Sequence, residues 1–210
     1  MANEEHVAML KQGVDAWNAW RKENPDIRPD LRGTDLSKAI LTRGDLRNAQ
    51  LSGANLSGAD LVRTMLHMAN LSEATLTGAI LWRALLLDTN LAGADLTGSH
   101  VYGIAAWDLK LDNAKQHNLV ITPPGTPEIT VDNIEVAQFV YLLLHNEKIR
   151  DVIDTIGKKG VLLLGRFTEG RMVVLERLRD KLRDLGFVPM VFNFDKPETK
   201  DFTETVRLLA

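Results

Sequence analysis

The sequence contains no cysteine, only two tyrosines, and no apolar run long enough to cross a membrane. Without cysteine the chain has neither disulfides nor thiolate metal ligands, as is common in a reducing compartment. Its first residues lack the basic segment and the apolar stretch of a secretion signal. These absences predict a soluble, cytoplasmic protein, and 210 residues allow one long or two modest domains.

An excess of either charge is also missing, because 25 basic residues stand against 28 acidic ones. Residues 1–24 carry 3 basic and 4 acidic groups, residues 25–110 carry 8 and 9, and residues 111–210 carry 14 and 15. No segment therefore has the basic surface that binds nucleic acid. We expect neither nucleic acid nor a membrane as a partner.

Catalytic and metal-binding patterns are absent from the sequence as well. The five histidines show no metal-ligand spacing, and no serine has a visible base partner. We therefore predict no catalytic residues, no metal site and no enzymatic activity.

What the sequence has is a ladder of fourteen leucines at every fifth position from Leu31 to Leu96, continued by Val101. The residue two places before each, from Thr34 to Ser99, is always small, and nine of these fourteen are alanine. A helix repeats its faces every 3.6 residues and a strand every 2, so neither could bury all the leucines. A solenoid of five-residue sides buries every one of them.

The segments Ala54–Gly58 (ANLSG), Ala59–Arg63 (ADLVR) and Ala94–Gly98 (ADLTG) resemble the repeats of pentapeptide-repeat proteins. The resemblance implies a mainly β fold, a right-handed quadrilateral β-helix with four sides per coil. Residues 20 apart would then stack at about the 4.8 Å spacing of neighbouring strands.

The ladder occupies residues 25–111, and the segments on either side differ from it. Residues 1–24 predict one N-terminal capping helix that begins after Asn3 and buries Trp17 and Trp20. The proline-rich stretch within residues 112–131 predicts a linker, and Asp132 with Glu135 predicts the start of a helical connector over 132–157. Residues 158–210 form a C-terminal α/β segment.

Two neighbouring faces of the solenoid carry outward apolar side chains. We expect these to be exposed and to form an interface with a protein partner or a second copy, giving a homo-oligomer. The alternative is that the helix from Asp132 folds back over them. The interface candidates are Ile40, Val62, Met65, Ile80, Trp82, Leu85, Leu87, Tyr102 and Trp107.

Arg43, Arg63 and Arg83 also follow the 20-residue spacing, at the edge of the same faces. Like charges about 5 Å apart repel unless anions or carboxylates lie between them. Asp45 and Asp60 are near enough to neutralise the arginines. The alternative is that the arginines bind an anion.

The C-terminal segment reads as strand, helix and strand: the apolar run Val161–Gly165, a helix from Thr168 to Gly186, and Val188–Phe194. This is one crossover unit with parallel strands. A further helix is expected from Thr203 to Leu209. The segment resembles the first half of the TIR-like domains that follow pentapeptide repeats in some cyanobacterial proteins. Either the sequence is a shortened piece, or the half-domain serves another purpose.

The turn after the first strand has two glycines, but Arg171 and Met172 follow where a Walker A motif requires Lys and Ser or Thr. It is either a structural turn or a phosphate site at a helix N-terminus. The resemblance to TIR-like domains implies a nicotinamide or adenine nucleotide there. The candidate residues are Gly165, Arg166, Thr168, Arg171 and Asp195.

These observations predict a non-catalytic scaffold or assembly module. One alternative is a signalling or antiphage effector whose complete TIR-like domain binds or cleaves NAD. The second is a DNA mimic that protects DNA gyrase, which the nearly neutral repeat region disfavours.

Overall fold

The computed structural model describes residues 2–165 and 169–193, and the chain divides into two compact units. The first unit, Met1–His145, contains α1 (Glu4–Lys11), α2 (Val14–Glu23), β1 (Leu85–Leu87), β2 (Ala105–Trp107), β3 (Leu119–Val120), β4 (Thr130–Val131) and α3 (Ile134–His145). The second unit, Asn146–Ala210, contains α4 (Glu147–Lys159), β5 (Gly160–Gly165), α5 (Glu169–Asp184) and β6 (Val188–Asn193).

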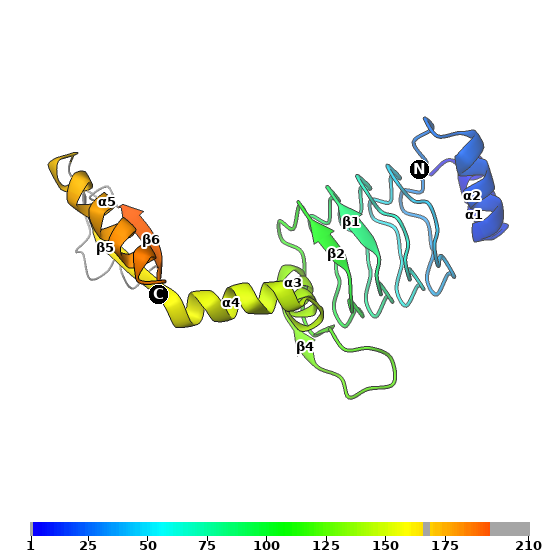
Figure 1. Ribbon diagram of the computed structural model, residues 1–210. Helices are drawn as coiled ribbons and strands as arrows, with labels where there is room; N and C mark the ends of the chain where they lie inside the picture. Colours follow the sequence, from blue (N-terminus) through cyan, green and yellow to red (C-terminus); the bar gives the residue numbers. More distant parts are fainter. Residues whose placement is uncertain (1, 166–168, 194–210) are drawn as a thin grey trace. The chain divides into compact units, whose positions relative to one another are not determined.

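The first unit is a solenoid whose coils take twenty residues each (Figure 1). Parallel bridges join residues 20 apart, from Asp30 with Gln50 to His100 with Val120. Between coils, the Leu71 backbone N–H donates to the Asn90 carbonyl at 2.7 Å, and the repeat leucines from Leu31 to Leu81, with Leu91 and Leu96, donate in the same way to the residue 19 positions later. The predicted stacking is therefore confirmed.

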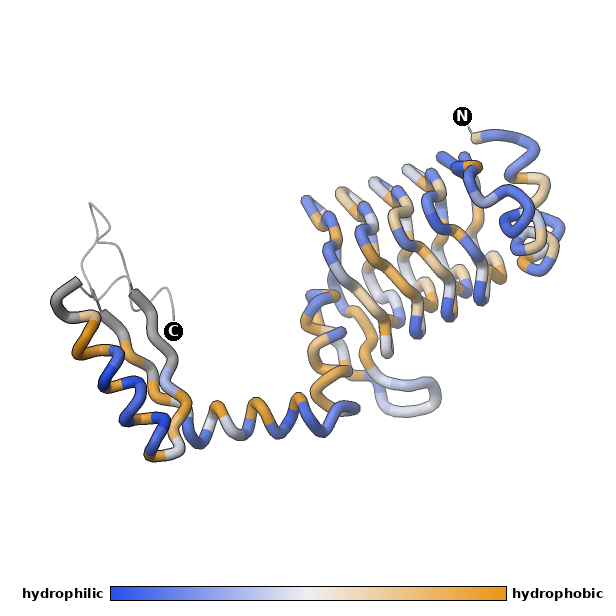
Figure 2. Tube along the Cα trace, turned by 45° about the horizontal axis from the view of Figure 1, so that its top comes forward, coloured by the Kyte–Doolittle hydropathy of each residue, from blue (hydrophilic) through white to orange (hydrophobic). Residues whose placement is uncertain are grey.

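The repeat leucines fill the interior of the coils, as predicted. From Leu31 to Leu96 each is at most 5% exposed, and Leu51 and Leu71 are completely buried. Figure 2 shows that apolar and polar residues alternate around each coil. Burying a leucine contributes roughly 1.5–3 kcal/mol before conformational entropy is subtracted, so this column is the main stabilising element of the fold.

Hydroxyl side chains replace alanine at a few small positions, and three of them bond to the preceding coil. Thr64, Thr89 and Ser99 are completely buried and donate to the carbonyls of Leu41, Leu66 and Leu76 at 2.7–2.8 Å. Each carbonyl lies 23 residues earlier in the chain. Thr34 belongs to the first coil and has no coil before it, and in the described part of the chain its hydroxyl has no hydrogen-bond partner.

The N-terminal segment forms two helices, so the prediction of a single helix over 1–24 is wrong. The break falls at Gly13, whose φ of 109° lies in a region that side chains disfavour. Asn3 caps α1 by accepting hydrogen bonds from the backbone of Glu5 and His6. Trp17 of α2 is completely buried, and its indole nitrogen donates to the Asp45 carbonyl at 2.8 Å.

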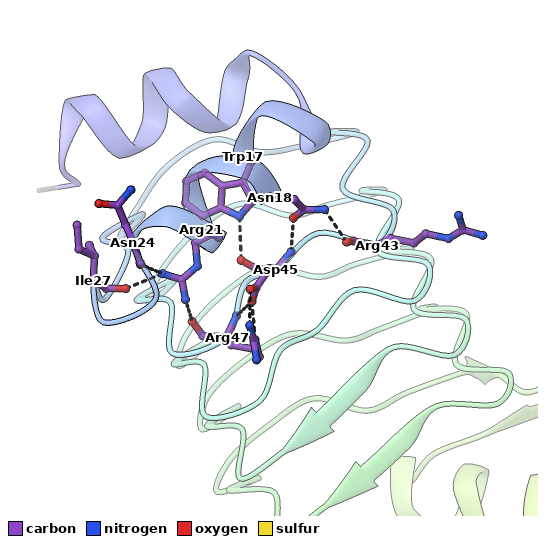
Figure 3. A network of polar contacts seen from close by, with 8 residues as sticks. All are labelled: Trp17, Asn18, Arg21, Asn24, Ile27, Arg43, Asp45 and Arg47. Carbon is purple, nitrogen blue, oxygen red and sulfur yellow. Dashed lines mark hydrogen bonds and ion pairs between the residues drawn. The ribbon is translucent and has the colours of Figure 1, made fainter.

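A polar network joins α2 to the first coil (Figure 3). Arg21 is 3% exposed and donates to the carbonyls of Asn24, Ile27 and Arg47. Burial lowers the pKa of Arg21. Burial also pushes the pKa of Asp45 upward, but the hydrogen bonds from Arg47 and the positive charges nearby outweigh it, so this pKa lies below its usual value.

Helix α3 packs against the other end of the solenoid, and its buried Ile134 and Ala137 join the same core. Where a following coil would accept from Ala106, the side chain of Gln138 accepts its N–H instead. The helix begins at Ile134 because Asn133 caps it by accepting from the Val136 N–H.

Two details of α3 differ from the sequence prediction. Asp132 does not cap the helix, because its carboxylate accepts from the Asn118 N–H. The predicted connector over 132–157 is divided between the units, since α3 belongs to the first and α4, capped by Asn146, to the second.

In the second unit β5 and β6 pair in parallel, from Gly160 with Val188 to Gly165 with Asn193. Helix α5 connects them and contacts β6, so the crossover unit forms as the sequence predicts. The helix expected at Thr203–Leu209 lies outside the described residues. Within the described ranges, helices hold more residues than named strands, so the term mainly β fits the solenoid only. None of the described helices is both long and apolar enough to span a bilayer.

The hydroxyl bonds between coils can be tested with a matched pair of variants. Thr64→Val removes a buried hydrogen bond and should lower the free energy of unfolding by about 1 kcal/mol. Thr34→Val makes the same change where no hydrogen bond exists and should not lower it. Chemical denaturation followed by circular dichroism measures both. Equal losses would contradict the assigned roles.

The first coil should also contribute to acid unfolding. A hydrogen bond from the Arg32 side chain lowers the pKa of Asp30 to about 2. The stability gained from ionised Asp30 is therefore present above the ordinary pKa of about 4 and is lost as the pH falls to about 2. Asp30→Asn should flatten the fall in unfolding free energy over that interval. A variant with the wild-type pH profile would show that Asp30 makes no such contribution.

Candidate functional site

One groove of about 300 Å³ lies along a corner of the solenoid. We call it the arginine groove. It is lined by Thr42, Arg43, Val62, Arg63, Trp82, Arg83, Tyr102 and Pro124. All but Pro124 belong to two adjacent columns at the 20-residue spacing, so the structure brings the predicted arginine column and part of the predicted apolar surface into one site.

The three arginines occupy the same position of the same turn in successive coils, with φ values of 61°, 55° and 56°. This left-handed conformation costs roughly 1–2 kcal/mol for a residue with a side chain. In the neighbouring column, which begins at Lys38, the same position holds Gly58, Gly78 and Gly98. The backbone conformation of the turn therefore does not explain why these three positions hold arginine.

The carboxylates expected to neutralise the arginines bind elsewhere. Asp45 forms an ion pair with Arg47 at 2.7 Å, and Asp60 accepts from the Thr42 hydroxyl at 2.8 Å. Across residues 2–165 and 169–193, no ion pair joins Arg43, Arg63 or Arg83 to a carboxylate. The prediction that Asp45 and Asp60 serve them is wrong, and three exposed cations remain together.

The aromatic side chains of the arginine groove are held by contacts within the chain. Trp82 meets His100 edge-on with ring centroids 6.0 Å apart, and its buried indole nitrogen has no hydrogen-bond partner among the described residues. Tyr102 meets Tyr141 of α3 edge-on at 5.1 Å, and its hydroxyl lies 3.2 Å from Nε2 of His145. Nδ1 of His145 donates to the Tyr141 carbonyl at 2.8 Å, because a carbonyl oxygen can only accept.

Both ends of the arginine column are set by helices. At the start, the Asn18 side chain of α2 donates to the Arg43 carbonyl at 3.1 Å, while the Arg43 side chain points away from this network (Figure 3). At the other end the column reaches Gly103. A Cβ there would lie 3.2 Å from Tyr141 and 3.3 Å from the Arg83 side chain, so glycine lets α3 approach.

The remaining interface candidates lie outside the arginine groove. Leu85 and Leu87 on β1 and Trp107 on β2 are 37%, 39% and 53% exposed, and the strand register places Leu87 beside Trp107. We call this surface the β1–β2 face. Ile40 is 76% exposed on another column. The other five candidates are partly buried rather than exposed, namely Val62, Met65, Ile80, Trp82 and Tyr102.

Part of the predicted apolar surface is covered by other segments of the same chain, which was the alternative to an interface. Helix α3 lies against Tyr102, and the loop between β3 and β4 brings Pro124 to the arginine groove. Leu87 and Trp107 stay exposed within the first unit.

The nucleotide candidates are placed only in part. Gly165 is the last residue of β5, and Arg171 lies in the first turn of α5. Arg166, Thr168 and Asp195 fall outside the described residues, so this site stays a prediction. A cluster of metal-binding side chains is not found in the described part of the chain.

Sequence reasoning missed several residues around these surfaces. Thr42 shares the column of Val62 and could have been found from the spacing, as could the exposed Met68 beside the β1–β2 face. Pro124, Tyr141 and His145 lie beyond the repeats. No periodic signal relates them to a coil.

Comparison with known proteins agrees with this architecture. The solenoid is a β-helix of twenty-residue coils, and the family model of pentapeptide repeats matches residues 30–67 and 69–103 in eight copies. This region is therefore composed of pentapeptide repeats. No curated protein matches the chain.

Three solved structures of pentapeptide-repeat proteins are similar to part of this chain. One from the thylakoid lumen of Arabidopsis thaliana is 26% identical, covers 53% of this chain and 88% of its own, and gives a TM-score of 0.34. Rfr23 from the cyanobacterium Cyanothece 51142 is 34% identical over 36% of this chain and 58% of its own, with a TM-score of 0.18. A third, from Nostoc Pcc 7120, is 25% identical over 60% and 92%, with a TM-score of 0.22.

Proposed function

We propose that the chain is a non-catalytic assembly module that associates with a second copy of itself through the β1–β2 face. The observation behind this proposal is the exposure of Leu85, Leu87 and Trp107 side by side on two paired strands. Contiguous exposed apolar side chains on a soluble domain are typical of contact surfaces.

The rest of the first unit suits such a role. The leucine core holds the coils rigidly, so the outward side chains keep fixed positions. Helices α1 and α2 at one end and α3 at the other act as caps, since an uncovered coil would expose apolar side chains and unpaired backbone groups. A two-fold pairing would place Leu87 and Trp107 of each copy against the same surface of the other.

The second unit supports an alternative function. Its parallel β5 and β6, joined by α5, have the connectivity of a nucleotide-binding α/β domain. On this reading, assembly by the solenoid brings TIR-like domains together to bind or cleave NAD. Imitation of DNA is the weakest candidate, since the exposed arginines of the groove carry the opposite charge to a phosphate backbone.

Light scattering tests the assembly. Leu87→Ser combined with Trp107→Ser should convert a wild-type dimer into a monomer, because the change places polar groups in the contact. Ile129→Ser is the matched control, since Ile129 is 59% exposed but lies in the loop between β3 and β4. A wild-type chain that stays monomeric at high concentration would refute the proposal.

The NAD alternative has a separate test. If it is correct, incubation of the wild-type chain with NAD should either release nicotinamide or change the solution mass. Leu87→Ser with Trp107→Ser should reduce the release of nicotinamide if assembly is required. No release and no change in mass would reject this alternative for the chain.

A further inference from the structure

We propose that the arginine groove binds a helical segment of a partner protein that carries acidic side chains along one face. Arg43, Arg63 and Arg83 are exposed on one column, and the described residues supply no carboxylate to pair with them. Three cations stacked in this way repel one another unless an anionic group lies against them. The partner's charge is therefore negative.

The spacing of the arginines selects the form of the partner. Successive coils are about 4.8 Å apart, as neighbouring strands are. Carboxylates three or four residues apart on a helix are separated by about 5–6 Å, whereas side chains on one face of an extended strand are about 6.6 Å apart. Three arginines span about 10 Å, which corresponds to two helical turns. A helix lying parallel to the solenoid axis fits best.

The composition of the groove indicates that the partner is also apolar. Val62 and Trp82 lie in the column beside the arginines, and Pro124 borders the groove from the β3–β4 loop. An inorganic anion would contact the guanidinium groups and leave these side chains uncovered. An amphipathic helix covers both, with its carboxylates on the arginines and a neighbouring apolar stripe on Trp82.

The ends of the groove limit where the helix lies. Tyr141 of α3 closes the column at Gly103, so the partner extends from there toward Arg43. The aromatic group of Tyr102, Tyr141 and His145 fixes this end through ring contacts and hydrogen bonds. The arginine groove shares no lining residue with the neighbouring β1–β2 face, so the inference does not depend on self-association.

The experiment uses the full chain with Leu87→Ser and Trp107→Ser, so that self-association does not interfere. The probe is a synthetic fluorescent helix with glutamates at three positions four residues apart and leucines on the adjoining stripe. The control peptide has glutamine at the glutamate positions. Fluorescence anisotropy should show tighter binding of the glutamate peptide, and the difference should shrink as salt is added.

Two variants locate the contact. Arg63→Gln, in the middle of the column, should weaken binding of the glutamate peptide about tenfold through the loss of charge-assisted hydrogen bonds. Lys38→Gln is the matched control. Lys38 has nearly the same turn geometry, with φ of 56° against 55°, but lies on the neighbouring column. It should change the affinity less than about twofold.

Three results would overturn the inference. The glutamate peptide could bind no better than the glutamine peptide at low salt. Lys38→Gln could weaken binding as much as Arg63→Gln, which would show that the peptide responds only to the net charge of the chain. A single-stranded oligonucleotide could bind more tightly than the glutamate peptide, with the same loss in Arg63→Gln, which would make the groove a nucleic-acid site. None of these results bears on whether the chain dimerises.

Discussion

Backbone hydrogen bonds between residues about twenty positions apart determine where every outward side chain of the solenoid lies. The Leu71 N–H donates to the Asn90 carbonyl, and equivalent bonds repeat on each side of each coil. This register keeps the leucines inside and sorts the outward residues into columns. A column of arginines and a pair of apolar strands are thus consequences of one spacing, because any residue type repeated at twenty positions becomes a continuous surface.

The ends of the solenoid need other interactions, because the backbone groups of a terminal coil have no further coil to bond with. At the start, Trp17 and Arg21 of α2 donate to the carbonyls of Asp45 and Arg47 in the first coil. At the finish, Gln138 accepts the Ala106 N–H. The unpaired hydroxyl of Thr34 marks the place where no earlier coil exists. Both closing helices also contact the arginine column, through Asn18 and Tyr141, so the surface proposed for binding is framed by the elements that close the core.

The sequence predicted well the features that depend on the twenty-residue register of the coils. The buried leucines, the small column and the alignment of Arg43, Arg63 and Arg83 all follow from counting residues. What it predicted poorly depends on single contacts outside the repeat. Asp45 was an expected partner of the arginine column, but Arg47 lies two residues away and binds it first. The helix break depends on the single residue Gly13, and the arrival of Pro124 at the groove depends on the path of the β3–β4 loop, so neither leaves a periodic trace in the sequence.

The twenty-residue coil also limits how such a chain can change in length. An insertion or deletion of five residues inside the ladder would keep the leucines buried but rotate everything beyond it by one wall. Such a change at the coil of Trp82 would move Arg83 off the corner that Arg43 and Arg63 share. Only the gain or loss of a complete coil, through duplication or excision of twenty residues, leaves both the interior and the exterior pattern in alignment.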